Sequence, residues 1–116
     1  MALGASFMCL LHCLALPLVL AALPTLAAII PLPESFHVWM VTVAVLASGG
    51  ALVLGYRRHR ATSPTILGGT GLLLLVLGVT LSADTSEEVL VTVSGSLFLA
   101  VAHVLNWRLR YAIDAR

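Results

Sequence analysis

Residues 3–30, LGASFMCLLHCLALPLVLAALPTLAAII, form an apolar stretch without a charged side chain. A helix needs about 20 such residues to cross a bilayer. Three further apolar stretches follow at residues 36–56, 65–83 and 89–107. Because the links between the stretches are short, consecutive helices must run antiparallel. The sequence therefore predicts an all-α membrane protein, a bundle of four transmembrane helices that forms a single domain over residues 1–116.

The composition excludes several other classes of protein. Of the 116 residues, 60% are hydrophobic and 9% are charged, whereas about 25% are charged in a typical soluble domain. A soluble domain of this size could not hide so much apolar surface, and a disordered chain needs the opposite composition. Six basic residues in two separate places do not form a nucleic-acid-binding patch. We therefore expect membrane lipid as a partner and no nucleic acid.

The distribution of charge predicts how the helices cross the membrane. All the basic residues are arginines in the second link or the C-terminal tail: Arg57, Arg58, Arg60, Arg108, Arg110 and Arg116. The first and third links are instead acidic, with Glu34, Asp84, Glu87 and Glu88. Arginine-rich loops stay on the cytoplasmic side of a membrane. We therefore expect a multi-pass membrane protein with both termini in the cytoplasm.

A cleaved signal peptide is the alternative interpretation of the first stretch, because residues 21–28 are rich in alanine. A signal peptide begins with a basic region and has a short apolar segment. Here no Lys or Arg precedes the apolar residues, and the stretch is longer than such a segment. We therefore interpret residues 3–30 as a transmembrane span that is retained.

Two cysteines and a histidine lie close together in the first stretch. Cys9, His12 and Cys13 share one face of a helix, since positions i, i+3 and i+4 do so. Thiolate suits Cu(I) and Zn(II), and imidazole suits Zn(II). A disulfide is an alternative, but Cβ atoms four residues apart lie about 5–6 Å from each other, and a disulfide needs about 3.5–4.5 Å. Cysteine as an apolar filler of the core is another alternative.

Polar residues outside the first stretch extend the set of candidate ligands. His103 and Asn106 share a face of the fourth span at a depth similar to that of Cys9, which would allow a joint site. Alternatively, His103 bonds a neighbouring backbone group. His37, in the opposite leaflet, is either an outer capture point or a solvated residue, and we expect His59 to be solvated among arginines that contact anionic lipid. The candidate metal ligands are Cys9, Cys13, His12, His103, His37 and Asn106.

Over residues 4–110 the chain resembles the MerC family of mercury-resistance membrane proteins. The resemblance rests on Gly4-Ala5-Ser6 followed by Cys9, His12, Cys13 and Pro17, on His37, and on residues 55–60 and 102–106. It implies a four-span inner-membrane protein that takes up Hg(II), with the cysteine pair of the first helix, here Cys9 and Cys13, as ligands. Mercury transporters typically space this pair as Cys-x-x-Cys. Here the spacing is Cys-x-x-x-Cys, and the added imidazole of His12 moves the expected preference toward Zn(II) or another borderline ion.

We therefore expect a transporter and not an enzyme. It would take up Hg(II) or Zn(II) without a further cofactor and pass the ion to a cytoplasmic thiol or metal-carrier protein. The alternative is a non-transporting membrane module, a haem- or metal-binding sensor or an accessory subunit, with His12, His103 or Cys9 as axial ligands. A redox enzyme is disfavoured because the chain has no second cysteine pair. Glycine-rich faces of the second and third spans are candidate contacts for a homodimer.

Overall fold

The computed structural model describes residues 33–80 and 86–116, together with five isolated positions between residues 11 and 29. Within residues 33–80 and 86–116 the chain is helical and has no strand. Three helices follow one another along the chain: α4 (Glu34–His59), α5 (Ser63–Thr80) and α6 (Ser86–Asp114). Apart from the isolated positions, the predicted first span at residues 3–30 lies outside the described residues. The predicted number of four helices is therefore not tested.

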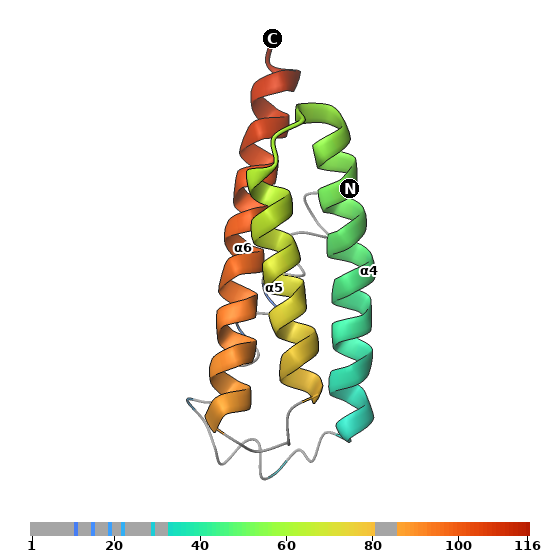
Figure 1. Ribbon diagram of the computed structural model, residues 1–116, viewed down its shortest axis with the longest axis vertical. Helices are drawn as coiled ribbons and strands as arrows, with labels where there is room; N and C mark the ends of the chain where they lie inside the picture. Colours follow the sequence, from blue (N-terminus) through green and yellow to red (C-terminus); the bar gives the residue numbers. More distant parts are fainter. Residues whose placement is uncertain are drawn as a thin grey trace.

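All three described helices are long and apolar enough to cross a membrane. The antiparallel arrangement predicted from the short links is confirmed for them, because α5 runs opposite to both α4 and α6 (Figure 1). The 29 residues of α6 rise about 44 Å, which exceeds the roughly 30 Å hydrocarbon core of a bilayer. The helix therefore continues beyond the apolar stretch expected at 89–107, as far as Asp114.

The link between α4 and α5 is shorter than the sequence suggests. Residues 57–59 still belong to α4, which ends at Arg60 in a left-handed conformation with φ 56°. The backbone N–H of Arg60 donates to the carbonyl oxygen of Tyr56 at 2.8 Å, which satisfies one of the last carbonyls of the helix. Residues 60–62 are therefore all that separates α4 from α5.

Glycines allow α5 and α6 to pack closely. A Cβ atom built on Gly71 would lie 2.7 Å from the carbonyl oxygen of Gly95, and one built on Gly95 would lie 2.9 Å from that of Gly71. Close backbone approach is a main source of helix association in lipid. Beside this crossing, the buried apolar core consists of Leu52, Leu75, Leu99 and Ala102. The interpretation of small residues as helix contacts is thus confirmed for this crossing, whereas Gly49, Gly50 and Gly69 have open space around them.

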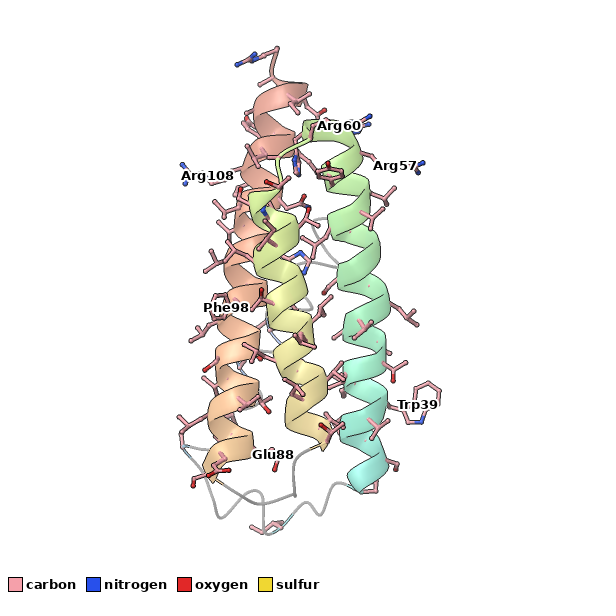
Figure 2. The ribbon with its side chains drawn as sticks, in the orientation of Figure 1. Trp39, Arg57, Arg60, Glu88, Phe98 and Arg108 are labelled. Atoms are coloured by element: carbon pink, nitrogen blue, oxygen red, sulfur yellow. The ribbon has the colours of Figure 1, made fainter. Side chains whose placement is uncertain are left out.

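The charges of the described helices separate toward the two ends of the bundle. Arg57, Arg60 and Arg108 lie near the C-terminal end of α6, and Glu88 lies at the opposite end (Figure 2). At the arginine end, Arg58 Nη1 lies 3.0 Å from Asp114 Oδ1. Both side chains of this pair are 58% exposed, so the pair adds about 0–1 kcal/mol to stability. The labelled arginines and Glu88 thus lie at opposite ends of the bundle, as the alternation of basic and acidic links in the sequence predicted.

Candidate functional site

Polar residues line a buried face of α6, which contacts α4 through His103 and Asn106. Ser96, His103 and Asn106 are buried, with 2%, 7% and 5% of their surface exposed. Spacings of seven and three residues place them on one side of the helix. Buried polar groups inside an apolar bundle are costly unless they are hydrogen-bonded. Each of their polar atoms therefore needs a partner or a function.

His103 is held by a serine of α4. Its Nε2 lies 3.0 Å from the hydroxyl oxygen of Ser48, a residue that is only 1% exposed. The second ring nitrogen of His103, Nδ1, is buried and has no hydrogen-bond partner within the described part of the chain. The hydroxyl of Ser96, two helical turns earlier in α6, is also buried without a partner. The middle of this face thus combines one anchored imidazole with two unsatisfied polar atoms.

Closer to the arginine end, His59 and Asn106 form a second polar group, whose hydrogen bonds are all made within the bundle. The backbone N–H of Ala61 donates to Nδ1 of His59 at 3.0 Å, so the neutral ring carries its proton on Nε2. That Nε2–H donates to Oδ1 of Asn106 at 2.9 Å. The amide nitrogen of Asn106 donates in turn to the carbonyl oxygen of Ala51 at 3.4 Å. Two of these bonds, His59 to Asn106 and Asn106 to Ala51, tie α4 to α6, and the bond from Ala61 fixes the His59 ring. We call the three bonds the His59–Asn106 network.

A glycine of α4 makes room for this network. Gly55 is buried, and a Cβ atom built on it would overlap the amide of Asn106, lying 2.6 Å from Cγ and 2.8 Å from Nδ2. Cβ atoms do not approach heavy atoms so closely without displacement of one of them. The absence of a side chain at Gly55 is therefore what lets Asn106 reach both His59 and the backbone of α4.

The expectation that His59 is a solvated member of the arginine cluster is wrong. Its ring is partly buried and bonded to α6, whereas its neighbours Arg57 and Arg58 are exposed. The sequence does contain a signal for this. Small or apolar residues recur at helical spacing along the buried face of α4, and His59 ends the series Ala44, Ser48, Leu52, Gly55, His59.

The structure brings together two of the predicted ligands, His103 and Asn106, which lie on one buried face of α6 as expected. Cys9, His12 and Cys13 lie outside the described residues. His37 lies in the first turns of α4, but its side chain is outside what is described, so its capture role is untested. Among the described residues, no group of three or more His, Cys, Asp or Glu side chains could hold a metal ion.

Comparison with known proteins extends over the part of the chain that carries these residues. The family model of the MerC mercury resistance protein matches residues 1–108. No curated protein and no solved structure matches the chain. The match covers all the candidate ligands, including the cysteines, and all of α4 and α5.

Proposed function

The chain belongs to the MerC family of mercury-resistance proteins, and we propose that it carries a soft or borderline heavy-metal ion, Hg(II) or Zn(II), across a bacterial inner membrane. The single observation that carries this proposal is the match over residues 1–108. Helices apolar enough to span a membrane support it, because they suit a protein that works within the bilayer. Transport, and not catalysis, is the proposed activity.

Cys9 and Cys13 are the proposed ligands of the transported ion. They are the only two cysteines of the chain, and both fall within the matched residues. Thiolates bind soft ions strongly, and the imidazole of His12 would add a ligand suited to zinc. An ion held by thiolates can leave by exchange onto other thiolates, so a cytoplasmic thiol or metal-carrier protein is the proposed acceptor.

The proposed orientation places the arginine end of the bundle in the cytoplasm. Arg57, Arg60 and Arg108 gather at that end (Figure 2), and basic residues are retained on the cytoplasmic side. With residues 3–30 as a fourth span, both termini would be cytoplasmic. The opposite end, with Glu87 and Glu88 in the first turn of α6, would then face outward and attract the cation, with His37 as the proposed capture residue.

Metal accumulation in cells tests this function. Cells that produce the wild-type chain are expected to accumulate more Hg(II) or Zn(II) than cells without it, and Cys9→Ser/Cys13→Ser should abolish the difference. The matched control is Ser94→Ala, which removes an exposed hydroxyl bonded only within α6 and should leave accumulation unchanged. Equal accumulation with and without both cysteines, at equal amounts of protein in the membrane, would rule out the proposed ligands.

A haem- or metal-binding module without transport remains the second candidate function. Its support is the buried Nδ1 of His103, which has no hydrogen-bond partner and could serve as an axial ligand. A haem absorption band in the purified protein, lost in His103→Leu, would favour this candidate. Accumulation that requires the cysteines in a haem-free protein would instead favour transport.

A further inference from the structure

We propose that Nδ1 of His103, with the ring oriented by Ser48, is a second binding position for the transported ion, which it receives from the cysteines. The inference rests on the proposed function and adds the atom, its orienting partner and its place in the route. His103 is 7% exposed, and its Nδ1 has no hydrogen-bond partner among the residues that the structure describes. A buried polar atom left without a partner lowers the stability of the fold, so its presence needs an explanation.

The hydrogen bond to Ser48 gives His103 the arrangement of a metal ligand. A histidine that binds a metal through one ring nitrogen is usually oriented by a hydrogen bond from the other nitrogen. Here Nε2 lies 3.0 Å from the hydroxyl of Ser48. When Nε2 carries the proton of the neutral ring and donates it to that oxygen, Nδ1 presents its lone pair. The lone pair then needs only a cation to become satisfied.

His59 provides the internal comparison that makes this assignment specific. Both of its ring nitrogens are already engaged, Nδ1 by the backbone of Ala61 and Nε2 by Asn106. Asn106 is also engaged, through its oxygen to His59 and its nitrogen to Ala51. We therefore assign Asn106 a positioning role and not that of a ligand. Of the two histidines whose side chains are described, only His103 offers a free ring nitrogen.

The proposed source of further ligands for an ion at His103 is the cysteine pair of the predicted first span. No cluster of three metal-binding side chains exists within residues 33–80 and 86–116, leaving the side chains of Glu34 and His37 aside. The thiols of the chain, Cys9 and Cys13, lie in the predicted first span. Counted at 1.5 Å per residue along the spans predicted at 3–30 and 89–107, with both chain ends on one side of the membrane, the sequence predicts similar depths for Cys9 and His103. A transfer between the two positions therefore needs little movement along the membrane normal.

The transfer itself is a ligand exchange without oxidation or reduction. The Nδ1 lone pair of neutral His103 forms a bond to the metal ion, and the bond from the ion to one thiolate sulfur breaks. The sulfur keeps both electrons of that bond and remains a thiolate, and the ion keeps its charge. Imidazole binds mercury and zinc less strongly than paired thiolates do, so the ion at His103 is poised to move on to an acceptor thiol.

The first test measures initial rates of Hg(II) or Zn(II) uptake in cells. His103→Gln keeps an amide group that can reach Ser48 but removes the ring nitrogen. Loss of a residue that only orients a metal ligand typically costs about 10–100-fold. Loss of the ligand itself should therefore lower the uptake rate at least tenfold. Ser48→Ala, which frees the ring to rotate, should lower the rate by about tenfold, and Ser94→Ala should not change it. If uptake requires Cys9 and Cys13 but His103→Gln takes up metal at the wild-type rate, the inference is overturned and the proposed function stays intact.

The second test needs no variant that must fold. Histidine labelled with a nitrogen isotope is incorporated into the full chain in lipid nanodiscs, and nuclear magnetic resonance follows the ring nitrogens as Zn(II) or Hg(II) is added. The inference predicts a shift of the His103 Nδ1 signal on metal addition, while both His59 signals stay in place. An unshifted His103 Nδ1 signal at saturating metal would overturn it. If uptake does not require the cysteines, the proposed function fails, and this spectrum alone decides whether His103 binds the ion.

Discussion

His59 and His103 lie on the same interface between α4 and α6 and differ in how their polar atoms are satisfied. Near the arginine end, His59 uses both ring nitrogens within the bundle, and the amide of Asn106 closes the His59–Asn106 network. Deeper in the bundle, His103 uses one nitrogen and leaves the other buried without a partner. A satisfied network stabilises one arrangement of helices, whereas an unsatisfied buried atom indicates a role that the folded chain alone does not fulfil.

The largest expected effect on stability comes from closing the space that the His59–Asn106 network occupies. Gly55→Ala would place a methyl group into the Asn106 amide, and overpacking of this kind costs about 1–3 kcal/mol. Unfolding in mixed micelles measures the loss. The matched control is Gly50→Ala on the same helix, where nothing lies within 4 Å of the added Cβ atom. Equal stability of the two variants would show that Asn106 does not pack against Gly55.

Exchanging each histidine for leucine separates the two regions directly. His59→Leu leaves Asn106 Oδ1 and the Ala61 N–H without their partner, so it should lower the free energy of unfolding by about 1–3 kcal/mol. His103→Leu removes an unsatisfied atom together with one hydrogen bond, so its cost should be about 1 kcal/mol or less. Metal uptake per folded molecule should show the reverse order, with the larger loss in His103→Leu. If the two variants rank in the same order in both measurements, the histidines do not have separate roles.

The ion pair beyond this network should contribute least. Arg58 and Asp114 join the ends of α4 and α6 at 3.0 Å but are both mostly exposed, and such pairs contribute about 0–1 kcal/mol. Arg58→Ala should therefore change unfolding slightly, and added salt should reduce the difference from wild type because screening weakens exposed pairs. A loss as large as that of His59→Leu would indicate that the arginine end is held by charge and not by the His59–Asn106 network.

The sequence predicted the parts of the fold that depend on local pattern. Apolar stretches at 36–56, 65–83 and 89–107 lie largely within the three described helices, because the length of an apolar stretch reports the thickness of lipid. The ends differ, since α4 reaches His59 and α6 reaches Asp114. A helix continues through polar residues as long as its backbone hydrogen bonds can form, and hydropathy does not detect this.

The sequence predicted which residues of the candidate site share a face of one helix, but not which residues contact each other across two helices. The spacing of His103 and Asn106 indicated a shared face of α6, which the structure confirms. Their partners Ser48, Ala51 and His59 depend on how α4 crosses α6, where Gly55 leaves room for the Asn106 amide. The arginines on either side of His59 suggested solvent, but the spacing from Gly55 directs its ring into the bundle.

Metal stoichiometry tests the central claim most directly. The purified full chain, reduced and in detergent, would be loaded with Hg(II) or Zn(II), freed of excess metal and analysed for metal per protein. We predict one tightly bound ion per chain in the wild type and in Ser94→Ala, and none in Cys9→Ser/Cys13→Ser. The same amount of bound metal with and without the cysteines, or no tightly bound metal in either protein, would contradict the claim that the cysteines hold the transported ion.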